Sequence, residues 1–203
     1  MDGDDATHLR EETISSRQVF RGHFLDVRSD RVRLPNGAEA GREYIVHPGA
    51  VMVVPLLDDG RLVVERQYRH PLARVMLEFP AGKIDTGESP AACAVRELAE
   101  ETGYHAREWA HAGVLHNAIA YSNEGIHVYF ARGLVAGQAA LDPGEFLDVS
   151  SATLEELLAL ARSGELTDAK TLIGLLWLQN WQSGQWPLIW GTHPEGDAPI
   201  MGA

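Results

Sequence analysis

The sequence is poor in cysteine, in long apolar runs and in positive charge. Its single cysteine, Cys93, cannot form an intrachain disulfide, which fits a reducing compartment. The longest apolar run, around residues 172–178, is too short to span a bilayer. The acidic, polar start lacks the basic and apolar parts of a secretory signal. These absences predict a cytoplasmic protein that has no membrane partner.

The charge balance is acidic, with 29 Asp and Glu residues against 17 Lys and Arg residues and a formal net charge of −12. Such a chain repels the phosphates of DNA and RNA, so we expect no nucleic-acid partner. A small phosphorylated ligand remains compatible, because a metal ion and a few basic side chains can bind it locally. The length of 203 residues suits one domain with an extension.

Turn signals and apolar patterns divide the chain into four parts. The alternating segment Asp30–Leu34 runs into Pro35-Asn36-Gly37, which indicates a β-hairpin near the N-terminus. The C-terminal residues are rich in Gly, Pro and Trp, which is typical of irregular structure. The expected parts are a flexible arm (1–15), an N-terminal antiparallel β extension (16–47), a main domain (48–182) and an irregular tail (183–203).

The main domain mixes strands and helices. Two apolar runs, Val51–Leu57 and Leu62–Tyr68, flank the turn Asp58-Asp59-Gly60 and predict a central hairpin. Ser89 is the expected N-cap of a helix that Gly103 closes. Further strands are expected over 111–115 and 126–132, and helices over 90–102, 153–163 and 168–181. Strands and helices without a regular βαβ alternation predict an α+β fold, in which helices sandwich a mixed sheet.

Three glutamates share one face of the first of these helices. Glu97, Glu100 and Glu101 are spaced i, i+3 and i+4, within about 100° of arc. Clustered carboxylates are the ligands that hard divalent cations such as Mg²⁺ prefer. The alternative is an ordinary solvated acidic face.

The loop before this helix bears on the choice between a cation site and a solvated acidic face. It runs from Gly82 to Glu88 and contains a second glycine, Gly87, and glycine lets backbone groups approach a ligand closely. Arg96 lies eight residues beyond Glu88 and can tie the loop to the helix by a bidentate pair. Loop and helix together favour a binding site over a plain surface.

These residues are spaced as in a Nudix box. Gly82 is followed by Glu88 and then by Arg96-Glu97-Leu98-Ala99-Glu100-Glu101-Thr102-Gly103, which together fill every fixed position of that pattern. Tyr104 departs from it, because an aliphatic residue is usual there. The chain resembles the Nudix hydrolase family, and its ADP-ribose pyrophosphatase branch over roughly residues 18–182. The further segments that carry the resemblance to this branch are 65–69, 77–82, 144–149 and 168–171.

The resemblance implies hydrolysis of the pyrophosphate bond of a nucleoside diphosphate derivative, with ADP-ribose as the leading substrate and AMP and ribose 5-phosphate as products. It implies Mg²⁺ as cofactor, with Mn²⁺ as the alternative, and a homodimer formed through the N-terminal extension. One alternative is a Nudix enzyme for another nucleotide sugar or dinucleotide. The other is a non-catalytic ligand-sensing module, which the complete set of box carboxylates disfavours.

The resemblance also assigns roles to residues. The implied metal ligands are Glu97, Glu100, Glu101 and the carbonyl of Ala81. The implied catalytic residues are Glu145 as the base, Glu100, and Arg96, which with Glu88 supports the loop. The implied substrate-binding residues are Arg69, Arg42 and Lys83. The alternatives are a surface arginine at Arg69, a solvated Lys83 and an ordinary acidic turn residue at Glu145.

One further departure concerns the segment after the box. Members of the branch commonly carry a proline where this chain has Ile119, within residues 117–124. Proline fixes φ and stiffens a loop, so its absence predicts a freer loop here. We therefore expect side activity on other ADP-sugars.

Overall fold

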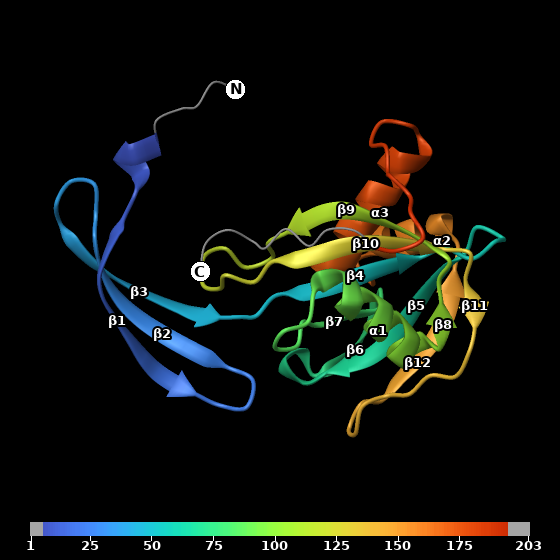
Figure 1. The fold of residues 1–203 in the computed structure, drawn as a ribbon, viewed down its shortest axis with the longest axis horizontal. Coiled ribbons are helices and arrows are strands. Elements are labelled where there is room, and N and C mark those ends of the chain that lie inside the picture. The colour runs from blue at the N-terminus through green and yellow to red at the C-terminus, as the bar shows by residue number, and fades with distance from the viewer. Residues whose placement is uncertain (1–5, 195–203) are drawn as a thin grey trace. The chain divides into compact units, whose positions relative to one another are not determined.

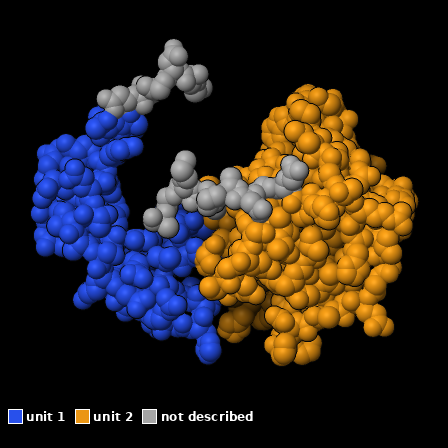
Figure 2. Space-filling model, viewed as in Figure 1, with its two compact units in different colours: residues 1–47, 118–124 blue, residues 48–117, 125–203 orange. Residues whose placement is uncertain are grey.

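The computed structural model describes residues 6–194. The chain divides into two compact units, one of residues 1–47 and 118–124 and the other of residues 48–117 and 125–203 (Figure 2). Among the described residues, no helix is both long and apolar enough to cross a membrane.

The first unit contains a three-stranded antiparallel sheet in the order β1-β2-β3 (Figure 1). Its elements are the 3-10 helix η1 (Ala6–Leu9) and the strands β1 (Glu12–Arg21), β2 (Asp26–Arg33) and β3 (Glu39–Val46). The expected turn joins β2 to β3, with Gly37 at a φ of 85° and the Leu34 N–H donating to the Ala38 carbonyl. Strand β1 already begins at Glu12, inside the stretch expected to be an arm, because β2 offers it a pairing partner.

The sheet of the first unit has almost no core of its own. All ten residues of β1 are exposed, among them the apolar side chains of Ile14, Val19 and Phe20. Within the described residues of this unit, Val32 is the only buried apolar side chain. Since a small sheet needs an apolar face packed against something, these strands cannot owe their stability to their own contacts alone.

The second unit holds three sheets. A mixed sheet has the order β7-β4-β10-β9, in which β4 pairs parallel with β10 and the other pairs are antiparallel. The others are β12-β5-β6 and the short pair β11-β8. The strands are β4 (Ala50–Pro55), β5 (Leu62–Arg69), β6 (Arg74–Glu78), β7 (Ala81–Lys83), β8 (Tyr104–His105), β9 (Glu108–Leu115), β10 (Ile126–Arg132), β11 (Val135–Ala136) and β12 (Leu147–Ala152), with the 3-10 helix η2 (His70–Leu72) after β5.

The predicted hairpin of β4 and β5 is wrong. The turn between them forms, with Gly60 at a φ of 84° and its N–H donating to Leu57. Beyond a single bridge between Leu56 and Leu62, the two strands enter different sheets. The backbone groups of β4 pair with β10 and β7 instead, and those of β5 with β6 and β12, which satisfies both edges of each strand.

Helices cover both faces of the mixed sheet, as the sequence predicted. The helices are α1 (Pro90–Thr102), α2 (Leu154–Ser163) and α3 (Ala169–Gln182). Alternate residues of β10 face opposite sides: Phe130 packs in one core cluster with Leu157 of α2 and Leu178 of α3, and Tyr129 packs in the other with Leu98 of α1. The result is a sheet between two helical layers.

The tail expected over residues 183–203 is described only as far as residue 194. Residues 183–194 contain no helix or strand apart from a bridge between Gly191 and Trp109. The ring of Trp190 packs 5.5 Å from that of Trp181, and the Arg132 guanidinium lies 4.0 Å from the Trp190 ring. The remaining residues, 195–203, lie outside the described part of the chain.

Candidate metal and phosphate site

Helix α1 begins and ends where its capping residues predicted. The Ser89 hydroxyl accepts the Ala92 N–H at 3.2 Å, and Gly103 closes the helix at a φ of 73°. Ala94 and Leu98 are fully buried in the core cluster on this face of the sheet. Since α1 is fixed at both ends and along its apolar side, its glutamates are held in place relative to the sheet.

Two of these glutamates converge on the start of β7. The Glu101 Oε2 atom accepts the Ala81 N–H at 3.0 Å. The Glu97 carboxylate lies so close to Gly82 that a Cβ atom there would overlap it. Glycine at this position is therefore a steric requirement, and Ala81, whose carbonyl is an expected metal ligand, directly precedes it in β7.

Arg96 ties the loop to the helix, as expected. Its Nε and Nη2 atoms donate to the two Glu88 carboxylate oxygens, each at 2.8 Å. This bidentate pair lowers the pKa of Glu88 to about 2. Its Nη1 atom donates to Glu97 at 2.8 Å and to Glu100 at 3.0 Å. Arg96 thus contacts the carboxylates that were expected to bind the metal.

The electrostatics of the carboxylates suit a cation. Burial is the main cause that raises the pKa of Glu97 and of Glu101, and the Glu65 and Glu97 charges raise that of Glu101 further. Within residues 6–194 no three carboxylate, imidazole or thiol groups are already arranged around one point. Arg96 contacts one oxygen of Glu97 and one of Glu100, so a cation would share these carboxylates with Arg96 or displace it.

Glu145 lies in the turn before β12 and belongs to the same neighbourhood. It is half-buried, and its Oε2 atom accepts the Asp142 N–H at 3.3 Å. Its charge contributes to the raised pKa of Glu97 and of Glu101, so it lies within electrostatic reach of both. The fold thus brings the predicted base, distant in sequence, towards the glutamates of α1.

Arg69 is held by a network of ion pairs, and the other residues of this network had no role predicted from the sequence. Its Nε and Nη2 atoms donate to the two oxygens of Glu78, at 2.7 and 2.8 Å. The Lys170 ammonium also contacts Glu78, and it lies 3.0 Å from Asp168. Glu78 and Lys170 both lie in segments that carry the family resemblance, which was the available signal. Phosphate binding by Arg69 stays a prediction.

Glu65 was also missed. It is 0% exposed, and neither of its carboxylate oxygens has a hydrogen-bond partner within the described residues. It pairs with Glu78 across β5 and β6, and burial followed by the Glu78 charge raises its pKa. The available signal was an acidic residue directly after the buried run Leu62–Val64.

The other two predicted substrate-binding residues have different surroundings. The side chain of Lys83 is exposed, and its carbonyl accepts the Arg96 Nη2–H at 3.3 Å. Arg42 belongs to the first unit, where its guanidinium binds Glu11 with an Nε–Oε2 distance of 2.9 Å. Substrate binding by either residue stays a prediction.

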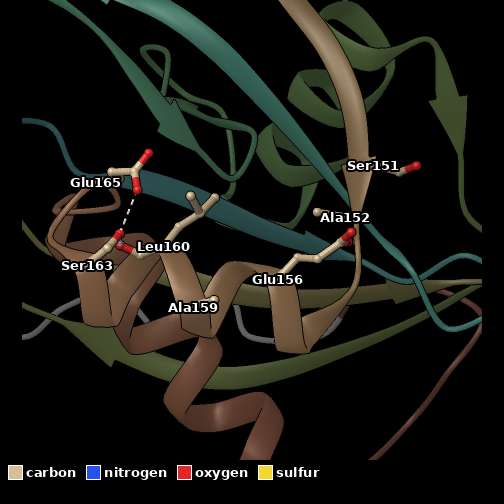
Figure 3. Close-up of a pocket in the computed structure, with 7 residues that line it drawn as sticks. All are labelled: Ser151, Ala152, Glu156, Ala159, Leu160, Ser163 and Glu165. Carbon is tan, nitrogen blue, oxygen red and sulfur yellow. Dashed lines mark hydrogen bonds between the residues drawn. The ribbon is translucent and has the colours of Figure 1, made fainter.

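A pocket of about 590 Å³ lies between β12 and α2 (Figure 3). It is lined by Ser151, Ala152, Glu156, Ala159, Leu160, Ser163 and Glu165. Glu156 belongs to the capping box of α2, and Ser163 donates to Glu165 at 2.8 Å, so both acidic residues already have local partners. None of the α1 glutamates lines this pocket.

Most of the chain is similar to known proteins. Residues 46–173 match the NUDIX domain family, and residues 11–45 match the nucleoside diphosphate sugar hydrolase N-terminal domain. An ADP-ribose pyrophosphatase of Bacillus subtilis (strain 168) is 40% identical over 173 residues, covering 84% of this chain and 94% of the relative. A methanol dehydrogenase activator of Bacillus methanolicus is 39% identical over the same length and shares. A crystal structure of an ADP compounds hydrolase is similar, with a TM-score of 0.78 and 27% identity, over 87% of this chain and 97% of that one.

The NUDIX domain match includes the residues of the candidate site. It spans more than half of the chain and includes α1, the loop before it and the strands that carry Glu65, Arg69 and Glu78. Of the residues that fill the box pattern, Gly82, Glu97 and Glu101 meet at β7. The chain therefore belongs to the Nudix family.

Proposed function

We propose that this protein is a Mg²⁺-dependent pyrophosphohydrolase that converts ADP-ribose to AMP and ribose 5-phosphate. One observation carries the proposal: the carboxylates of Glu97 and Glu101 converge beside Ala81 and Gly82. The similarity to the Bacillus subtilis ADP-ribose pyrophosphatase over most of both chains supports the substrate.

The residues of this site fit a hard divalent cation. Glu97, Glu100, Glu101 and the carbonyl of Ala81 would hold it, and an all-oxygen set suits Mg²⁺, or Mn²⁺ in its place. Burial and the neighbouring carboxylates raise the pKa of Glu101, and a cation beside it would stabilise its ionised form. When bound, the cation polarises the phosphoryl oxygens and lowers the pKa of a water molecule.

Residues of the chain accept the proton, bind the substrate phosphate and position the loop. Glu145 accepts the proton of the attacking water, since it is a half-buried carboxylate within electrostatic reach of Glu97 and Glu101. Arg69 donates to a substrate phosphate while Glu78 fixes the plane of its guanidinium. Arg96 and Glu88 hold the loop against α1.

A homodimer formed through the first unit is part of the proposal. Ile14, Val19 and Phe20 are exposed on a strand whose ten residues are all exposed, and such apolar side chains on a sheet call for a covering surface. A second copy of the same sheet would provide it. We expect a dimer mass in light scattering at micromolar concentration, and a shift toward monomer for Phe20→Ser. A wild-type protein that stays monomeric would contradict the proposal.

A panel of nucleotides tests the substrate. We expect ADP-ribose to have the highest kcat/KM with Mg²⁺, with identified products AMP and ribose 5-phosphate. The exposed Ile119 in the segment 118–124 supports measurable side activity on other ADP-sugars. A kcat/KM for ADP-ribose more than tenfold below that for a dinucleoside polyphosphate or a GDP-sugar would overturn the substrate and leave the family assignment intact.

The variant Glu145→Gln tests the base. A general base contributes about 10²–10⁴-fold in rate, so kcat should fall by that factor while KM changes little. A matched control is Glu155→Gln, because Glu155 is an exposed residue in the first turn of α2. If KM rises and kcat stays intact, Glu145 binds substrate and another group is the base.

A further inference from the structure

The backbone of residues 137–144, which follow β11, lies directly against the C-terminal end of α1. The Gly137 N–H donates to the Gly103 carbonyl at 2.6 Å, and the Ala140 N–H donates to the Glu100 carbonyl at 2.9 Å. Carbonyls in the last turn of a helix need such partners from outside the helix. All residues of the segment 137–144 are exposed, so its hydrogen bonds to α1, and not buried side chains, hold it in place.

Two glycines allow this close approach. A Cβ atom on Gly137 would lie 2.9 Å from the Gly103 carbonyl oxygen and 3.3 Å from the His105 ring. A Cβ atom on Gly103 would lie 2.8 Å from the Ala139 nitrogen. A carbon atom ordinarily stays about 3.3 Å or more from a carbonyl oxygen. Gly137 lies outside the left-handed region, so close packing and not backbone conformation requires glycine there, and a side chain would push the segment away from α1.

The same segment leads into the turn that carries Glu145. The Glu145 N–H donates to the Asp142 carbonyl at 2.9 Å, and the Asp142 N–H donates to the Glu145 carboxylate at 3.3 Å, so two hydrogen bonds close the turn. Beyond the turn, β12 begins at Leu147, which pairs with Gln67 of β5. The turn is therefore anchored to α1 on one side and to β5 on the other.

We propose that Gly137 is a positioning residue for Glu145, because its contact with Gly103 sets the distance between α1 and the turn 142–145. The inference rests on the proposed function, in which Glu145 accepts the proton of the attacking water. A general base acts only within hydrogen-bond reach of the group that it deprotonates. The carboxylates expected to bind the cation belong to α1, so this contact fixes the base relative to them. Gly137 itself lies outside the box pattern.

A double-mutant comparison on the full chain tests this role. Gly137→Ala should lower kcat for ADP-ribose about tenfold, because a misplacement of about 1 Å can cost about 100-fold and the shift expected here is smaller. In the Glu145→Gln background, where the base is already lost, the same substitution should change kcat by less than about twofold. The KM for ADP-ribose, and the Kd for Mn²⁺ measured by calorimetry without substrate, should stay within about twofold of the wild type, because the substitution leaves the α1 carboxylates in place.

Two further variants complete the comparison. Ala140→Pro removes the N–H that donates to the Glu100 carbonyl and leaves the Gly137 contact in place, so it should also lower kcat only when Glu145 is present. Gly191→Ala is the matched control, because the backbone of Gly191 is also hydrogen-bonded to another segment, at Trp109. A Cβ atom there would lie 3.5 Å from its nearest neighbour, which is an ordinary contact, so kcat should not change.

The outcomes separate failure of this inference from failure of the proposed base. Suppose that Glu145→Gln lowers kcat, and that whichever of the Gly137 and Ala140 variants folds lowers kcat equally in both backgrounds or leaves it unchanged in both. The positioning role is then overturned, and Glu145 stands as the base. If Glu145→Gln leaves kcat intact, both the base and the positioning role are wrong.

Discussion

The exposed ion pairs on the sheet of the first unit differ from the buried carboxylates at the candidate site of the second unit. In the first unit, Arg42 pairs with Glu11 and Arg31 with Glu39, and all four side chains are partly or largely exposed. In the second unit, carboxylates such as Glu101 are buried next to other carboxylates. The first arrangement contributes little to stability and the second opposes it.

This difference separates structural charges from functional ones. An exposed pair can form or break with little consequence, because water replaces each partner. A buried acidic cluster without full compensation persists only where something beyond folding requires it. The cluster that includes Glu65, Glu97 and Glu101 is of the second kind.

The largest effect should come from Glu101→Gln. Hydrolysis of ADP-ribose with Mg²⁺ should fall by at least about 100-fold, since even an outer supporting group of a metal site is worth up to that factor. Because the folded-state pKa of Glu101 is raised, its ionised form costs stability at pH 7, and the amide removes that cost while still accepting the Ala81 N–H. Thermal unfolding without metal should therefore occur at a higher temperature, and a lower one, with activity intact, would refute the contrast.

A middle-sized effect is expected for Glu88→Gln, with a pH signature. The pKa of Glu88 is lowered to about 2 by Arg96, so its pairing contributes fully above about pH 4.5 and is lost as the pH falls towards 2. A hydrogen bond to a charged group is worth about 1.5–3 kcal/mol. Urea unfolding at pH 7 should show a loss of that size, shrinking at lower pH; a loss that is independent of pH would show that the charge is irrelevant.

The smallest effect is expected in the first unit. Glu11→Gln removes the charge that binds Arg42, and both side chains are substantially exposed. Exposed ion pairs are worth about 0.2–1 kcal/mol, so the change in unfolding free energy should lie in that range and decrease with added salt. A change above about 2 kcal/mol would mean that the pair is buried in the protein in solution, as in a subunit interface.

Local signals were enough to predict part of this molecule. The bounds of α1 follow from Ser89, Pro90 and Gly103, whose effects act within one turn of the helix. The spacing of the box glutamates likewise placed the acidic face of α1. These features depend on residues that are close together in the sequence, so the sequence alone predicts them.

Contacts between residues that are far apart in the sequence could not be predicted in the same way. The order of strands was missed because β4 pairs with β10, more than 70 residues later in the chain, rather than with the adjacent β5. The pairing of Glu65 with Glu78 likewise brings together two carboxylates from different strands. The network around Arg69 could not be predicted either, because Lys170, which contacts Glu78, lies in α3.

The Arg96 side chain occupies carboxylates to which a cation would bind. One Nη1 atom of this residue contacts both Glu97 and Glu100, so the helix carries its own monovalent counter-ion. A divalent cation competes with that guanidinium for the two carboxylates. The affinity of the cation therefore depends on how much more strongly its concentrated double charge binds them than the delocalised single charge of Arg96 does. Monovalent ions lack that advantage. The competition would thus let the helix discriminate by charge density, keeping potassium and sodium out although carboxylates attract both.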